Sequence, residues 1–175
     1  RKHFYAMADI GLPLLLYNVP SRTGIDLSVE DVTALAAHPF IVGIKEASQD
    51  IEKATALRFA LPQEFGVYSG NDGMFLPYLS FGADGLISVV SNLVPRTMTN
   101  IYRQFQDGKQ EAAAKQFKSL YPLIRQLFCE TNPARVKYAM SLQEIGDGSL
   151  RLPLSPISAL HQEQIKNTIE SLHLS

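Results

Sequence analysis

Short apolar runs alternate with amphipathic stretches along the first ninety residues. The runs cover residues 12–18, 41–47, 65–69 and 85–90. Each is apolar nearly throughout, as are parallel strands covered on both faces. The intervening stretches repeat apolar residues at helical spacing, as at Val32, Leu35 and Ala36. Strands and helices that alternate with short connections predict right-handed βαβ units and a parallel sheet.

Capping residues support these helices. Ser28 and Asp50 are good N-cap residues, and Asp31 stands at the third position after Ser28, as in a capping box. Pro39 and Pro62 end the two helices.

After residue 90 the pattern is helical. Residues 96–106, 109–129, 132–144 and 158–172 are predicted helices, with no convincing strand between them. An α/β fold with four βα units fits a small open, doubly wound sheet or the second half of a (β/α)8 barrel with a C-terminal helical extension. The pattern alone favours the open sheet, because only four strands are present.

The composition excludes several classes of protein. The 175 residues carry a formal net charge of −1, so no basic surface for nucleic acid is expected. No apolar run reaches membrane-spanning length. Cys129 is the only cysteine, which excludes an intrachain disulfide, suits a cytoplasmic protein and predicts a small core residue. The chain begins within a helical pattern, and we interpret this start as a cut.

Candidate chemistry begins at Lys45, an amine within the β-branched run of residues 41–44. Burial favours the neutral amine, which is a nucleophile. Tyr17 and Arg22 follow the preceding run, so a phenol, a guanidinium and an amine at strand ends predict a site for carbonyl chemistry. The alternative is an edge-strand lysine whose stem reaches water.

Metal and nucleotide sites are not expected. His3, His38, His161 and His173 lack ligand spacing, and neither a phosphate loop nor a dinucleotide fingerprint occurs.

Five motifs occur in one order and spacing: residues 17–24 (YNVPSRTG), 43–47 (GIKEA), 69–72 (SGND), 85–89 (GLISV) and 132–137 (NPARVK). Together they resemble the dihydrodipicolinate synthase family, within the pyruvate-dependent class I aldolases that include N-acetylneuraminate lyase. The resemblance runs from about Leu12 to the C-terminus. It implies the C-terminal half of a (β/α)8 barrel over residues 1–107 and a helical extension over residues 108–175.

The resemblance also implies roles for individual residues. Lys45 matches the lysine that forms a Schiff base with pyruvate, so no other cofactor is needed, and Tyr17 matches the proton-shuttling tyrosine. Arg22 matches the arginine that contacts the carboxylate of aspartate-4-semialdehyde. The positions that line the pyruvate pocket correspond to Gly70, Asn71 and Ile87.

Two further positions bear on this resemblance. Gly24 allows a tight turn or a close approach to a ligand. Ala134-Arg135 stand where an apolar residue and a proline are common in the family, which puts the local helical packing in doubt.

The implied activity is condensation of pyruvate with aspartate-4-semialdehyde in lysine and diaminopimelate biosynthesis, by a homotetramer built as a dimer of dimers. The paired threonines and the neighbouring subunit's tyrosine of the family are absent from this chain. We therefore expect a fragment that is inactive alone. The alternatives are N-acetylneuraminate lyase, a 2-keto-3-deoxy sugar-acid aldolase, or a non-catalytic half-barrel assembly module.

Overall fold

The computed structural model describes residues 1–172, which form two compact units. The first unit is Arg1–Ile87, and the second begins at Ser88. Each unit has its own packing and is described by itself.

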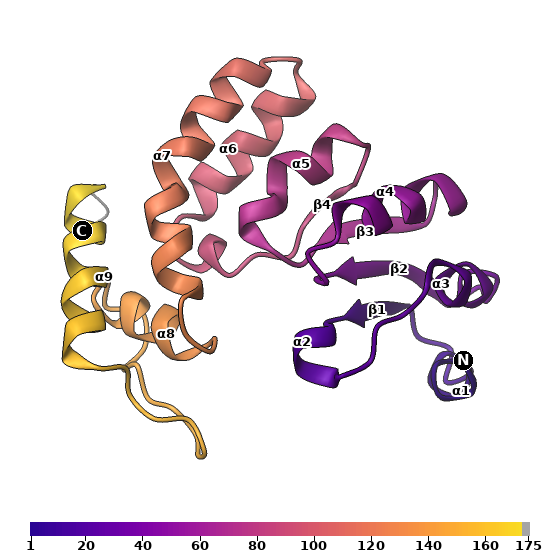
Figure 1. Cartoon of the computed structure of the whole chain (residues 1–175), viewed down its shortest axis with the longest axis horizontal. Helices are drawn as coiled ribbons and strands as arrows, with labels where there is room; N and C mark the ends of the chain where they lie inside the picture. The colour runs from indigo at the N-terminus through magenta and orange to yellow at the C-terminus, as the bar shows by residue number, and fades with distance from the viewer. Residues whose placement is uncertain (173–175) are drawn as a thin grey trace. The chain divides into compact units, whose positions relative to one another are not determined.

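The first unit is built on a parallel four-stranded sheet (Figure 1). Its strands are β1 (Leu14–Asn18), β2 (Ile41–Glu46), β3 (Gly66–Ser69) and β4 (Gly85–Leu86). They lie in the order β1-β2-β3-β4. The predicted α/β class with a parallel sheet is confirmed. Each strand is added on the same side of the one before it. A doubly wound sheet instead reverses the direction in which strands are added, and this reversal places helices on both of its faces.

Helices follow the strands of this unit. They are α1 (Lys2–Ala8), α2 (Pro20–Thr23), α3 (Val29–Leu35), α4 (Ile51–Ala60) and α5 (Phe75–Ser80), with a 3-10 turn η1 (Asp72–Met74). Ser28 Oγ accepts the Asp31 N–H at 3.0 Å, and Asp50 Oδ1 accepts the Lys53 N–H at 3.0 Å. Both predicted helix starts are therefore confirmed, and each cap satisfies an otherwise unpaired amide.

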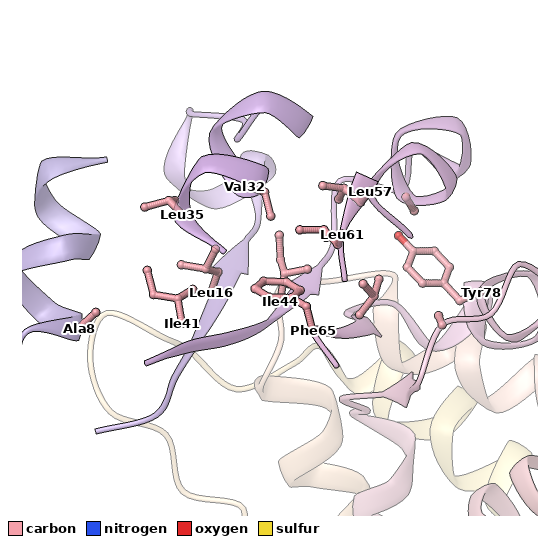
Figure 2. Close-up of a cluster of buried hydrophobic side chains, with 13 residues drawn as sticks. Ala8, Leu16, Val32, Leu35, Ile41, Ile44, Leu57, Leu61, Phe65 and Tyr78 are labelled. Carbon is pink, nitrogen blue, oxygen red and sulfur yellow. The ribbon is translucent and has the colours of Figure 1, made fainter. Parts of the chain in front are cut away.

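The core of this unit lies between the sheet and the helices that follow β1 and β2. Figure 2 shows Leu16 and Ile44 on the sheet below Val32 of α3 and Leu57 of α4. These four side chains are buried, at 0–1% exposed. On β1 the alternate positions Leu15 and Tyr17 are 37% and 44% exposed. The predicted cover on both faces is therefore wrong for these side chains, because α3 and α4 pack on the Leu16 side.

The fourth strand is shorter than the predicted run of residues 85–90. It stops at Leu86, although the Ile87 N–H still donates to the Ser69 carbonyl at 2.9 Å. Ser88 Oγ then accepts the Ser91 N–H at 2.8 Å, and a 3-10 turn, η2 (Val90–Asn92), follows. A serine side chain that bonds a nearby amide competes with strand pairing, which the apolar pattern does not reveal.

The second unit is helical. Its helices are α6 (Pro95–Gln106), α7 (Gln110–Phe128), α8 (Ala134–Ser141) and α9 (Ala159–Ser171). They lie within or next to the four predicted ranges, and α7 packs against α6 and α9 (Figure 1). None of the helices in residues 1–172 is long and apolar enough to cross a membrane.

Helix α7 buries the stripe of Leu120, Leu123, Ile124 and Leu127. Cys129 lies two residues past Leu127, off this stripe, and is exposed, so its predicted place in the core is wrong. Its thiol instead donates to the Gln126 carbonyl at 3.4 Å.

Candidate active site

The paired ends of β1 and β2 bring together the two residues with predicted catalytic roles. Tyr17 lies opposite Lys45 in the parallel register. Lys45 Nζ is 4.2 Å from the centroid of the Tyr17 ring, within cation–π range. Strand β2 pairs with β1 on one side and β3 on the other, so the edge-strand interpretation of Lys45 is wrong. The half-buried amine extends from a central strand.

Gly70 allows close packing beside the lysine stem. A Cβ at this position would lie 2.6 Å from Ala47 Cβ and 3.2 Å from Lys45 Cε. The Gly70 N–H donates to the Glu46 carbonyl at 2.7 Å, which joins the segment after β3 to the end of β2. Any side chain at position 70 would therefore displace the Lys45 stem or the backbone beside it.

Arg22 lies on α2, the short turn that begins two residues after Asn18. Its side chain is exposed. Gly24 ends this turn with φ +69° and donates to the Pro20 carbonyl at 2.9 Å. No atom lies within 4 Å of a Cβ built on Gly24. Of the two roles considered for Gly24, the structure supports the tight turn.

Asn71 and Ile87 follow β3 and β4. Asn71 Oδ1 accepts the Gly73 N–H at 2.9 Å, and Ser69 Oγ accepts the Asn71 N–H at 3.2 Å. The Asn71 side chain is thus engaged in its own turn. Ile87 is 36% exposed and bonds β3 through its backbone.

Two buried polar residues that the sequence reasoning missed lie one position beyond the Tyr17–Lys45 pair. Asn18 is 2% exposed and Glu46 is fully buried, and they are register partners. Asn18 Nδ2 donates to Glu46 Oε2 at 2.8 Å, and Glu46 Oε1 accepts the Ser48 N–H at 2.5 Å. The signal available in the sequence is a polar residue directly after each candidate catalytic residue at a strand end.

The same network reaches the segment after Arg22. Asn18 Nδ2 also donates to Asp26 Oδ1 at 2.8 Å, and Asn18 Oδ1 accepts the Leu27 N–H at 3.0 Å. Lys53 Nζ contacts Asp26 Oδ1 and lies 3.7 Å from Glu46 Oε2. The hydrogen bond from Lys53, supported by the one from Asn18, lowers the pKa of Asp26 below its ordinary 3.8 against a smaller opposing effect of burial.

Two tyrosines adjoin this region. Tyr68 of β3 is the register partner of Lys45. Burial, with the charges of Glu46 and Asp50 adding to it, raises the pKa of the Tyr78 phenol far above its ordinary value. Tyr78 therefore stays protonated, whereas Tyr17 is accessible at the strand end.

The histidines, for which the sequence predicted no metal site, have separate partners in the described chain. His38 Nε2 lies 3.2 Å from Asp9 Oδ1, and His161 contacts Glu130 in the second unit. His173 lies outside the described residues. Over residues 1–172, no three His, Cys, Asp or Glu side chains gather in a way that could hold a metal ion.

The arrangement around Lys45 is suited to amine chemistry. A primary amine that lies beside a phenol can add to a carbonyl group while the phenol moves a proton. The polar network beneath fixes the strand ends that carry both groups.

Comparison with known proteins shows the family to which this chain belongs. The model of the dihydrodipicolinate synthetase family matches residues 1–172. A 4-hydroxy-tetrahydrodipicolinate synthase of Methanococcoides burtonii is 44% identical over 172 residues, which are 97% of this chain and 59% of that protein. The protein of the same name from Macrococcus caseolyticus is 43% identical over 164 residues, 93% of this chain and 55% of that protein.

Solved structures give the same result. The 4-hydroxy-tetrahydrodipicolinate synthase of Methylacidiphilum fumariolicum SolV has a TM-score of 0.95 and 43% identity, covering 98% of this chain and 58% of that one. Dihydrodipicolinate synthase of Thermotoga maritima has a TM-score of 0.96 and 36% identity, covering 99% and 61%. The chain thus spans about three fifths of the length of the relatives it matches.

Proposed function

Because this chain belongs to the dihydrodipicolinate synthetase family, we propose that it supplies the Schiff-base lysine of an enzyme that condenses pyruvate with aspartate-4-semialdehyde. The product would be 4-hydroxy-tetrahydrodipicolinate, in lysine and diaminopimelate biosynthesis. One observation carries the proposal: Lys45 Nζ lies 4.2 Å from the Tyr17 ring at the carboxyl ends of two paired strands. The carboxyl ends of strands are where parallel α/β barrels form their active sites.

The first step is imine formation at Lys45. The amine adds to the ketone carbon of pyruvate, and water leaves. The iminium withdraws electrons, so the methyl group loses a proton and becomes an enamine carbon nucleophile. That carbon attacks the aldehyde of the second substrate, and a carbon–carbon bond forms. The amino group that came from the semialdehyde then attacks the imine carbon, which closes the ring and displaces the Lys45 amine, so the chemistry needs no cofactor besides the covalent imine.

Tyr17 and Arg22 would serve the two substrates. The Tyr17 phenol can relay the protons of imine formation and of aldehyde attack, provided that a hydrogen-bonded partner lowers the barrier. The Arg22 guanidinium can hold the carboxylate of aspartate-4-semialdehyde through paired hydrogen bonds. Gly70, Asn71 and Ile87 would shape the pyruvate pocket through backbone groups, which fits the engagement of the Asn71 side chain in its own turn.

The architecture belongs to the same proposal. The four βα units would be half of a (β/α)8 barrel, with residues 1–107 in the barrel and residues 108–175 in a helical extension. The partially exposed face of β1 supports this, because in a closed barrel the helices cover the outward face of each strand and the other strands enclose the inward face. The assembled enzyme would be a cytoplasmic homotetramer made of two dimers.

Borohydride reduction in the presence of pyruvate, followed by peptide mass mapping, tests the chemistry. We expect a reduced pyruvyl adduct on Lys45 and none on Lys45→Ala. If only a form extended to the length of the relatives gives the adduct, the chemistry holds and the described sheet does not complete the site alone. Absence of an adduct from both forms would refute the aldolase proposal and favour a non-catalytic module.

Tyr17→Phe tests the relay while keeping the ring beside Lys45. The rate of adduct formation should fall about 100-fold or more, as is usual when a general acid–base group is lost. Tyr5→Phe is the matched control, because the Tyr5 hydroxyl bonds only the Ala34 carbonyl among the contacts of the described chain. An unchanged rate in Tyr17→Phe would assign the proton transfers to another group.

Arg22→Lys tests the identity of the aldehyde. Lysine keeps the charge but loses the paired geometry of the guanidinium. The KM for aspartate-4-semialdehyde should rise while the pyruvate adduct forms at the normal rate. Efficient cleavage of N-acetylneuraminate or of a 2-keto-3-deoxy sugar acid, with no turnover of the semialdehyde, would instead identify one of the alternative aldolases.

A further inference from the structure

We propose that Asn18 is a positioning residue, which fixes the segment that carries Arg22 against the strand end that carries Lys45. The expected change in kinetics rests on the proposed function. The expected loosening of residues 20–27 rests on the hydrogen bonds alone. Asn18 does not face Lys45: its neighbour Tyr17 does, and alternate residues of a strand point to opposite faces. Its influence on catalysis would therefore pass through other residues.

The side chain of Asn18 joins three separate segments. Its amide donates to Glu46 at the end of β2 and to Asp26 in the segment after α2, both at 2.8 Å. Its carbonyl oxygen accepts the Leu27 N–H at 3.0 Å. At 2% exposure, water cannot replace these partners. A buried amide with its donors and its acceptor all engaged permits one arrangement of the segments it joins.

Other ties of the segment from α2 to Leu27 are backbone bonds to Val19 and an ion pair from α4. The exposed Gly24 and Ile25 separate Arg22 from Asp26. Thr23 Oγ1 donates to the Val19 carbonyl, directly after β1, and to the Ile25 carbonyl within the segment. Lys53 reaches Asp26 from α4 with a side chain that is 12% exposed, but half of the Asp26 side chain is open to solvent, which weakens the ion pair. Asn18, at 2% exposure, is the more deeply buried of the two side chains that join this segment to Glu46 of β2.

This geometry predicts a division between the two substrates. Pyruvate reacts with Lys45, which β1 and β3 hold by strand pairing. The semialdehyde carboxylate would depend on Arg22, which the Asn18 network holds. Loosening that network should therefore weaken the binding of aspartate-4-semialdehyde more than the reaction with pyruvate. A general loss of stability would instead affect both substrates.

The test variant is Asn18→Asp, which keeps size and the acceptor for Leu27 but places a carboxylate against Glu46 and Asp26. Hydrogen exchange of the intact 175-residue chain at pH 7.5 should become at least tenfold faster at the amides of residues 20–27. Amides of α4 should be unchanged. Asn100→Asp is the matched control, because its amide bonds Gln116 on an exposed helical surface.

A donor–acceptor exchange provides the rescue. In the triple variant Asn18→Asp/Asp26→Asn/Glu46→Gln, the new amides at positions 26 and 46 can each donate to the new carboxylate at position 18. Their oxygens can still accept from Lys53 and from the Ser48 N–H. We expect protection of residues 20–27 to return to within about threefold of the original. Failure of the single variant to loosen this segment, or of the triple variant to restore it, overturns the positioning role.

Kinetic measurements complete the test. They use the 175-residue chain or the form extended to the length of the relatives, whichever traps pyruvate. Asn18→Asp should raise the KM for aspartate-4-semialdehyde at least tenfold and change the rate of pyruvate trapping less than twofold. Equal effects on both substrates would show a purely structural role and overturn the proposal. If the unaltered protein traps no pyruvate, the proposed function fails, and the exchange data still decide whether Asn18 holds the segment.

Discussion

The fully buried charged side chains of Glu46, in the first unit, and Arg135, in the second, are held in different ways. Glu46 at the end of β2 has a hydrogen-bond donor on each carboxylate oxygen, from Asn18 and Ser48. Arg135 on α8 donates to the Gln126 carbonyl at 2.6 Å and to Glu130 Oε1 at 3.4 Å. Its Nε has no hydrogen-bond partner among residues 1–172.

The difference shows what each buried charge does. Glu46 is satisfied on both oxygens and joins strand ends beside Tyr17 and Lys45, where geometry must be exact to within fractions of an ångström for catalysis. Arg135 binds a backbone carbonyl near the end of α7 and pairs with Glu130, whose side chain is 32% exposed. Its partner can therefore be solvated if Arg135 is lost, whereas the partners of Glu46 cannot.

Glu46→Leu should have the largest effect of the changes considered. It leaves the buried Asn18 amide and the Ser48 N–H without their acceptor and Lys53 without one of its two carboxylates. We expect unfolding of the first unit to become easier by about 3–5 kcal/mol, the usual result of removing one member of a buried polar pair. Hydrogen exchange under increasing urea measures this for each unit separately.

Glu52→Leu is the control for Glu46→Leu, because Glu52 is exposed in the first turn of α4. A change below about 0.5 kcal/mol is expected there. A loss in Glu46→Leu no larger than in this control would mean that the network contributes nothing to stability.

Arg135→Met should lower the free energy of unfolding by less, about 1–3 kcal/mol, and only in the second unit. Methionine fills the volume of the stem, Glu130 can turn to water, and the unsatisfied Nε disappears with the charge. The same urea-dependent exchange measures it, with the exposed Arg125→Met of α7 as the control. An effect larger than that of Glu46→Leu would reverse the comparison.

The sequence predicted that Tyr17 and Lys45 lie close together, because strand order is local information. Tyr17 and Lys45 each end an apolar run, and successive parallel strands bring such ends to one edge of the sheet. The Asn18–Glu46 bond follows from the same register but gives no signal in composition or periodicity. Only the polar residue after each candidate catalytic residue indicates it.

Other features depend on packing that no local pattern encodes. The sequence marked Ala134-Arg135 as a departure from the family, yet it gave no sign that the guanidinium would be fully buried. Likewise, the Ser88 hydroxyl accepts the Ser91 N–H between β4 and η2, a contact that the apolar pattern of residues 85–90 does not reveal. Cys129 was placed in the core because its neighbours are apolar, although it lies off the buried stripe of α7.

The smallest expected effect is the change with pH in the stability of the segment at residues 20–27. The pKa of Asp26 is lowered in the folded chain, chiefly by its hydrogen bond with Lys53, so the unfolded segment binds more protons than the folded one at acid pH. The stabilisation is therefore fully present above the ordinary value of 3.8 and is lost as pH falls through the folded value. Protection factors of residues 20–27, corrected for intrinsic exchange, should fall between pH 5 and pH 3.

The size of this effect is limited by solvent. Half of the Asp26 side chain is exposed, so its ion pair is worth no more than about 1 kcal/mol, or roughly fivefold in protection. Asp26→Asn should remove the pH dependence, whereas Asp31→Asn, which alters another carboxylate of lowered pKa, should keep it. A persistent fall in Asp26→Asn would place the titrating group elsewhere in the network, and Glu46, the other carboxylate bonded to Asn18, would be the next residue to replace.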